Sequence, residues 1–160
     1  MLLRILILLF ILAESTKLYA DDIPVIVIAP SKKAQSISTV GTTVTVLDEK
    51  FFKNTNKMFL GDVLAGSSTS INFFQNGGAG TTSGIQLRGL PKRYSTVYID
   101  GIKMSDPSNV SNDFDFNNIL TSQISRVEIL KGTQSSVYGS GAIGGTVNIT
   151  TKKGKQGFHK

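Results

Sequence analysis

The sequence contains no cysteine and a single histidine, His159, next to its last residue. The lack of cysteine excludes a disulfide framework, a zinc–thiolate site, a thiol nucleophile and a Cys-ligated iron–sulfur cluster. A histidine so close to a chain end is poorly held in place, which argues against a Ser-His-Asp triad or a histidine-based metal site. The sequence therefore predicts neither an enzyme nor a resident metal or cofactor.

Acidic residues are scarce: 11 Asp and Glu stand against 17 Lys and Arg, a formal net charge of +6. Hydrophobic residues make up 40% of the 160 positions, which is enough for the core of one domain. The 16 glycines follow no Gly-X-Y period, so they indicate turns rather than collagen.

The first 20 residues are typical of a secretory signal. Arg4 precedes the apolar run Ile5–Leu12, and Ala20 offers a small residue at a cleavage site directly before Asp21. The run is too short to span a bilayer, and no other run is long enough. We expect cleavage near Ala20; a buried core helix is the alternative.

Alternation and β-branched residues predict strands over 42–47, 71–74, 85–89, 97–104, 124–132 and 146–151. Asp100-Gly101 divides the fourth of these into a tight hairpin, because that turn requires positive φ at both central residues. Asp48 is suited to cap a helix, and a second helix is predicted over 57–65, capped by Thr55 or Asn56 and stopped by Gly66.

Four runs, in this order, resemble signatures of the plug domain of TonB-dependent outer-membrane receptors. They are Gln86-Leu87-Arg88-Gly89-Leu90, Val97-Tyr98-Ile99-Asp100-Gly101-Ile102, Asp106-Pro107-Ser108, and the stretch 124–149, which contains Arg126-Val127-Glu128-Ile129-Leu130-Lys131-Gly132 and Tyr138-Gly139-Ser140-Gly141-Ala142-Ile143-Gly144-Gly145. The match covers Thr42 to Lys153.

This resemblance implies an α+β plug over residues 37–153, with a small mixed β-sheet, short helices and long loops. A plug occludes a 22-stranded outer-membrane barrel, binds a scarce nutrient on its outer loops and is remodelled when TonB pulls on it. The run 75–80 looks most like the cobalamin transporter subgroup, and a ferric siderophore is the other expected ligand. The expected localisation is the outer membrane.

The resemblance also assigns the apolar start of the mature chain to a TonB box, followed by a linker to residue 36. An extended, loosely tethered segment can add a strand to the sheet edge of TonB, which works with ExbB and ExbD. Two departures, an apolar residue where a polar one is expected and a proline that lacks a donor, leave the register open. An ordinary buried first strand is the alternative. The residues concerned are Ile23, Pro24, Val25, Ile26, Val27, Ile28 and Ala29.

The resemblance also implies roles for two further groups of residues. Arg88, Arg126 and Glu128 are expected to face the barrel, where plug arginines meet carboxylates. The expected ligand-binding loops contain Gln75, Asn76, Gly77, Gly78, Asp113, Phe114 and Phe116. The two phenylalanines are either ligand anchors or part of the core, and the core is slightly favoured.

The sequence supports other binding functions less well than the plug resemblance. The G-x-G-x-x-G run 139–144 continues on a β-period with no acidic residue after it, so dinucleotide binding is rejected. Asp113 and Asp115 lack an EF-hand pattern and are interpreted as solvated loop charges. The basic tail has no recognition motif, so no nucleic-acid partner is expected.

The length limits what this chain does alone. A 22-stranded barrel at about 10 residues per strand needs roughly 220 residues, whereas removing 20 of 160 residues leaves 140. We therefore expect residues 154–160 to be the truncated start of a β-barrel that the chain lacks. A stand-alone periplasmic binding module of the same fold, which does not transport, is the alternative.

Overall fold

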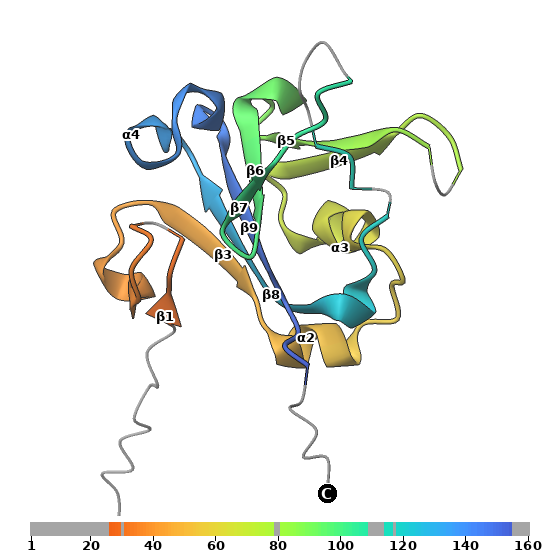
Figure 1. Ribbon diagram of the computed structural model, residues 1–160, viewed down its shortest axis with the longest axis horizontal. Coiled ribbons are helices and arrows are strands. Elements are labelled where there is room, and N and C mark those ends of the chain that lie inside the picture. The colour runs from red at the N-terminus through yellow and green to blue at the C-terminus, as the bar shows by residue number, and fades with distance from the viewer. Residues whose placement is uncertain (1–25, 30, 79–80, 109–113, 117, 155–160) are drawn as a thin grey trace, which may run out of the picture.

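The computed structural model describes residues 26–29, 31–78, 81–108, 114–116 and 118–154. Its centre is a five-stranded sheet with the strand order β3-β8-β9-β6-β7 (Figure 1). β6 and β9 are parallel and the other neighbours are antiparallel, so the sheet is mixed, as predicted. The strands are β3 (Thr43–Leu47), β6 (Ser95–Ile99), β7 (Ile102–Met104), β8 (Ile124–Lys131) and β9 (Gly145–Thr151).

Two short antiparallel pairs flank this sheet. One is a ribbon of β4 (Ile71–Gln75) and β5 (Ser83–Leu87), and the other joins β1 (Ile26–Val27) to β2 (Gln35–Ser36) near the start of the described chain. The α-helices are α2 (Glu49–Asn54), α3 (Leu60–Ser67) and α4 (Ser135–Tyr138). Single 3-10 turns occupy Ile37–Thr39, Lys92–Tyr94, Thr121–Gln123 and Ser140–Ala142. Among the described residues, no helix has the length and apolar character needed to cross a membrane.

The two faces of the sheet have different chemistry. Val97, Val147 and Ile129 lie in register across β6, β9 and β8, and all three are buried in the main core. Helix α3 and the β4–β5 ribbon cover this face. At the next register position across the three strands, Tyr98, Asn148 and Glu128 lie on the opposite face, which is more polar here.

Two local predictions are confirmed. The Asp48 carboxylate accepts a hydrogen bond from the backbone N–H of Phe51 at 2.8 Å and so caps α2. Asp100 and Gly101 have φ of 49° and 85° and connect β6 to β7 as a two-residue hairpin. The α+β fold class, with a mixed sheet and few short helices, is confirmed as well.

Four local predictions are wrong. Helix α3 begins at Leu60 rather than at residue 57, because Phe59 forms a β-bridge with Leu120 and the extended backbone there delays the helix. Neither Thr55 nor Asn56 caps it, and it runs through Gly66 to residue 67. The predicted strand 85–89 ends at residue 87, since the two residues that follow have positive φ. Helix α4 was not predicted.

Candidate functional site

The predicted TonB box is docked on the polar face of the sheet as far as the structure describes it. Val27 and Ala29 are buried, with 0% and 3% exposure, whereas the side chain between them, Ile28, is 54% exposed. This alternation is that of an extended strand with one face against the domain. Ile23, Pro24 and Val25 lie outside the described residues.

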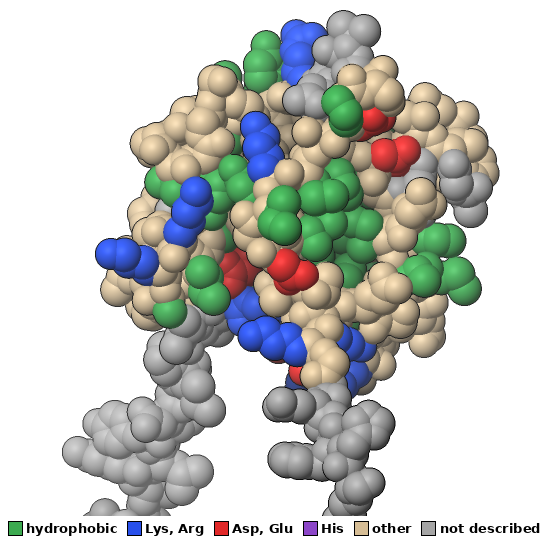
Figure 2. All heavy atoms as spheres, viewed as in Figure 1, with side chains coloured by type: hydrophobic (Ala, Val, Ile, Leu, Met, Phe, Trp, Pro, Cys, Tyr) green, Lys and Arg blue, Asp and Glu red, His purple; other side chains and the backbone are tan. Residues whose placement is uncertain are grey.

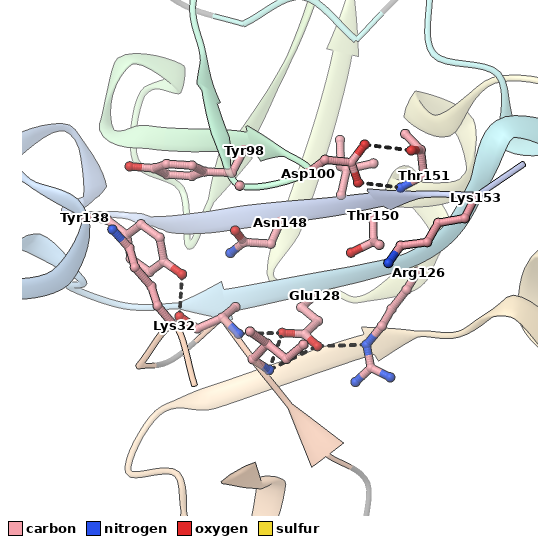
Figure 3. Close-up of a pocket in the computed structure, with 14 residues that line it drawn as sticks. Lys32, Tyr98, Asp100, Arg126, Glu128, Tyr138, Asn148, Thr150, Thr151 and Lys153 are labelled. Carbon is pink, nitrogen blue, oxygen red and sulfur yellow. Dashed lines mark hydrogen bonds and ion pairs between the residues drawn. The ribbon is translucent and has the colours of Figure 1, made fainter. Parts of the chain in front are cut away.

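Glu128 of β8 holds this segment by its backbone. Its carboxylate accepts hydrogen bonds from the N–H of Ile28 at 3.0 Å and from the N–H of Ala29 at 2.7 Å (Figure 3). Arg126, on the same face of β8, forms an ion pair with Glu128 through Nε at 2.7 Å. Glu128 is only 4% exposed. The three donors replace the water that the buried carboxylate has lost, so it satisfies the requirement that buried charges be paired.

Tyr138 of α4 provides a second anchor from the other side. Its hydroxyl donates to the backbone oxygen of Ala29, and burial raises the pKa of this hydroxyl. The ring packs against Tyr98, with 4.9 Å between centroids. The Lys32 ammonium lies 5.1 Å from the centre of the Tyr138 ring, and the positive φ of Lys32, 58°, turns the chain back over it. The predicted linker therefore contacts the domain at Lys32, whose side chain is exposed.

A cavity of about 560 Å³ lies beside the docked segment. Asp100 lines this cavity and accepts hydrogen bonds from the N–H and hydroxyl of Thr151 at 2.9 and 2.6 Å (Figure 3). These bonds hold the pKa of Asp100 below its ordinary value. Lys153 and Thr150 also line the cavity. In Figure 2, acidic side chains lie next to basic ones above the point where the two ends leave the domain.

A second charged cluster lies at the opposite end of β8. Arg88 and the buried Lys131 line a shallow hollow of about 240 Å³, and the Lys131 ammonium donates to the hydroxyl of Ser68 at 2.6 Å. The pKa of Lys131 is lowered mainly by burial and also by the nearby charge of Arg88. Within the described part of the chain, no salt bridge joins either cation to a carboxylate. The cluster is therefore a place where carboxylates of another segment or chain would be stabilised.

The predicted ligand-binding residues separate into two kinds. Gln75, Asn76, Gly77 and Gly78 lie at the end of the β4–β5 ribbon, where the Gln75 amide donates to the carbonyl of Gly78. In Figure 1 this ribbon projects from the upper part of the domain, whereas both ends of the described chain leave at the lower edge. This end of the ribbon is the part of the predicted ligand surface that lies open.

The phenylalanines belong to the core. Phe116 is 1% exposed and Phe114 packs edge-on against it, with 4.9 Å between centroids. Asp115, interpreted from the sequence as a solvated charge, is exposed and also accepts hydrogen bonds from the N–H and hydroxyl of Ser83 at 3.2 and 2.8 Å. These bonds tie the loop to β5. Asp113 lies outside the described residues.

Of the predicted barrel-facing charges, Arg88 is exposed beside Lys131, whereas Arg126 and Glu128 lie at the docked segment. Their contacts with a barrel stay a prediction. Lys131 and Tyr138 were missed, because each occupies a position that alternation or local apolar spacing assigns to the core. The sequence did contain one signal: a lysine stands at a position that alternation assigns to the core, and lysine is almost never fully buried without a partner.

Residues 36–146 match the family described as the TonB-dependent Receptor Plug Domain. Solved structures with the same fold include the ferric enterobactin receptor PfeA of Pseudomonas aeruginosa, with 23% identity and a TM-score of 0.55 over 70% of this chain and 18% of that one. The ferric yersiniabactin uptake receptor FyuA of Yersinia pestis is 24% identical, with a TM-score of 0.54 over 72% and 18%. FpvA of P. aeruginosa, bound to a pyoverdine, is 20% identical, with a TM-score of 0.65 over 80% and 16%.

The fold and the family match define the class of protein: this chain belongs to the TonB-dependent receptor plug domain family. It spans less than a fifth of the length of these solved receptors. At such identities the structures establish the shared fold alone. The three receptors named are siderophore receptors, and none of them supports the cobalamin subgroup.

Proposed function

We propose that this chain is the plug of an outer-membrane receptor that imports a scarce nutrient with energy supplied through TonB, ExbB and ExbD. The observation that carries the proposal is the match of residues 36–146 to the plug family. The plug occludes a 22-stranded barrel, binds the nutrient on one side and presents the TonB box on the other. It makes or breaks no bond in the nutrient, so it is not an enzyme.

The arrangement of the domain supports two separate working surfaces. The β4–β5 ribbon, with Gln75 and Asn76 at its end, projects sideways from the upper part of the domain, whereas both ends of the described chain leave at the lower edge (Figure 1). The docked segment, Ile26 to Ala29, lies near that lower edge. A ligand and TonB therefore reach different surfaces, as gating from one side and pulling from the other requires.

The Arg88 and Lys131 cluster is the proposed contact with the barrel wall. Two neighbouring cations, one of them buried, repel each other, and this repulsion is relieved when carboxylates approach. We include Lys131 with the predicted Arg88, because the structure places them around the same hollow. Arg126 is a second proposed barrel contact, on the other end of β8.

A ferric siderophore is the nutrient class we favour over cobalamin, since siderophores are bound or taken up by the receptors named above. Deletion of the gene in the source bacterium is expected to abolish uptake of one ⁵⁵Fe-labelled siderophore and to leave ⁵⁷Co-labelled cobalamin uptake unchanged. Loss of cobalamin uptake alone would select the other ligand. Normal uptake of both classes would refute nutrient import.

The coupling role is tested by binding of the purified TonB C-terminal domain to the full chain. Proline at residue 26 removes a backbone donor from the predicted box and disturbs strand addition. We expect Ile26→Pro to abolish binding and Lys33→Pro, in the exposed turn that follows, to retain it. Equal binding by wild type and Ile26→Pro would contradict the assignment of the box.

A further inference from the structure

The end of the β4–β5 ribbon carries the only Asn-Gly pair in the sequence, Asn76-Gly77. The pair directly follows the last residue of β4, and both residues are exposed. The backbone N–H of Asn76 donates to the carbonyl of Thr82 at 3.1 Å and so closes the ribbon. Among the described residues, no hydrogen bond involves the Asn76 side-chain amide or the Gly77 N–H. Both groups are therefore accessible to water.

Such a pair is chemically unstable, because the peptide nitrogen of the glycine can attack the side chain of the asparagine before it. A bond forms between the Gly77 nitrogen and Cγ of Asn76, the bond from Cγ to Nδ2 breaks, and ammonia leaves with the proton of the attacking nitrogen. Water then opens the resulting succinimide ring at one of its two carbonyls and leaves either aspartate or isoaspartate. Glycine favours the attack because it has no Cβ to crowd the ring.

We propose that Asn76 is a site of spontaneous deamidation, which converts an uncharged end of the ribbon into an acidic one. The described residues at this end, Gln75, Asn76, Gly77 and Gly78, carry no charge. Water is the co-reactant of the proposed reaction. Each product adds one carboxylate at residue 76, and isoaspartate also lengthens the backbone by one carbon. The modification itself does not depend on the proposed import function.

Asn72 is the natural comparison, because it lies in the same ribbon and is exposed as well. Its amide nitrogen donates to the side-chain oxygen of Gln86 at 3.1 Å. The next peptide unit, at Phe73, lies inside the β4–β5 pairing, where Phe73 is opposite Ile85. Ring closure at Asn72 requires this pairing to open and the Cβ of a phenylalanine to approach the ring. The structure therefore selects Asn76 over Asn72 by pairing and not by burial.

Asp100-Gly101 is the second comparison, because an aspartate before a glycine can close the same ring with loss of water. The Asp100 carboxylate accepts hydrogen bonds from the N–H and hydroxyl of Thr151 at 2.9 and 2.6 Å. These bonds fix the side chain away from the following peptide nitrogen, and they lower the pKa of Asp100, which keeps it ionised. An ionised carboxylate is a poor target for a nucleophile, so the fold protects this pair.

The consequence for the nutrient, unlike the modification, rests on the proposed function. The new carboxylate lies on the end of the ribbon that we expect to contact the ligand. A unit charge close to an anionic ligand at a water-exposed surface changes affinity by about fivefold. Deamidation is therefore expected to weaken binding of an anionic ferric siderophore by about that factor.

The first measurement follows the full chain during warm incubation in mildly alkaline H₂¹⁸O, with peptide mass spectrometry at intervals. We expect residue 76 to gain the mass difference between an amide and an ¹⁸O-labelled carboxyl group, as a mixture of aspartate and isoaspartate. Asn72 and Asp100 are expected to stay unlabelled. A synthetic peptide of residues 71–83, which lacks the rest of the fold, is the positive control for the chemistry.

Two variants test the route. Asn76→Gln is expected to lose the modification, because a glutamine would have to close a larger ring. Gly77→Ala keeps the asparagine but crowds the attacking nitrogen, and it is expected to lose most of the modification. Its new Cβ would lie 3.2 Å from the Thr81 methyl group, so a small shift of that group accommodates it. Direct hydrolysis of the amide, without the ring, would instead persist in Gly77→Ala and give no isoaspartate.

The outcomes separate the modification from its consequence. An unmodified residue 76 in the folded chain, after the peptide control is converted, overturns the proposal, as does equal labelling of Asn72 or Asp100. In the source bacterium, Asn76→Asp is expected to raise the concentration of ⁵⁵Fe-labelled siderophore needed for half-maximal uptake by about fivefold relative to Asn76→Gln. Equal uptake by both variants refutes the consequence alone. If the wild type imports no siderophore, the proposed function fails, and the mass spectra still decide the modification.

Discussion

Phe116→Ala distinguishes a core residue from a ligand anchor. The side chain is 1% exposed, and the edge-on ring of Phe114 lies against it. Truncating a buried phenylalanine costs about 3–5 kcal/mol, through lost apolar transfer and the cavity left behind. Since a domain of this size has about 5–15 kcal/mol in total, the substitution removes a large share of the stability of the plug.

Urea and thermal unfolding followed by circular dichroism measure this loss. At roughly 4 °C per kcal/mol for a domain of this length, the midpoint falls by roughly 12–20 °C. Phe114→Ala, at a half-buried ring, is the matched control, and we expect a loss about half as large. A loss below about 1 kcal/mol for Phe116→Ala, together with weakened nutrient binding by the whole receptor, would refute the core assignment.

Three further predictions concern positions that the fold constrains. Gly145→Ala is expected to cost more than about 2 kcal/mol in urea unfolding, because φ is 145° and a Cβ would overlap the carbonyl oxygen of Leu130. Asp100→Asn keeps the hairpin but removes a carboxylate whose pKa is lowered in the folded state. The wild type loses the stability that this carboxylate contributes as pH falls below about 3.8, so we expect the variant to lose less thermal stability over the same pH range. Lys131→Met is expected to raise the urea midpoint of the chain at pH 7, since the lowered pKa means that burial disfavours the ammonium. The wild-type gain in stability as pH rises toward 10.5 is absent from this variant.

The strands of the main sheet were predictable because their signals are local. β8 and β9 alternate apolar and polar residues along their length, and the Asp100-Gly101 turn carries its own conformational requirement. The start of α3 was not predictable, because it depends on a bridge between Phe59 and Leu120, 61 positions apart. The local sequence around Phe59 carries no information about such a long-range contact.

The docking of the predicted TonB box could not be predicted from the sequence for the same reason. Glu128 lies 99 positions after Ala29, and Tyr138 lies 109 positions after it. The sequence indicated only that an apolar segment follows the predicted signal peptide and that Glu128 shares a face with Arg126. The partner of that face depends on how the chain folds back at Lys32, a residue whose positive φ no motif announces.

The alternation of β8 separates the residues that stabilise the plug core from those that hold the N-terminal segment. Val127 and Ile129 point into the main core, where they hold β8 between β3 and β9, whereas Arg126 and Glu128 point to the face that the N-terminal segment covers. Adjacent residues on one strand thus contribute to two different equilibria. Substitution of Ile129 changes unfolding of the whole domain, and substitution of Glu128 changes release of a few residues. The N-terminal segment is held by side-chain anchors and by a two-residue strand pair outside the five-stranded sheet, so we expect it to separate from the domain before that sheet unfolds.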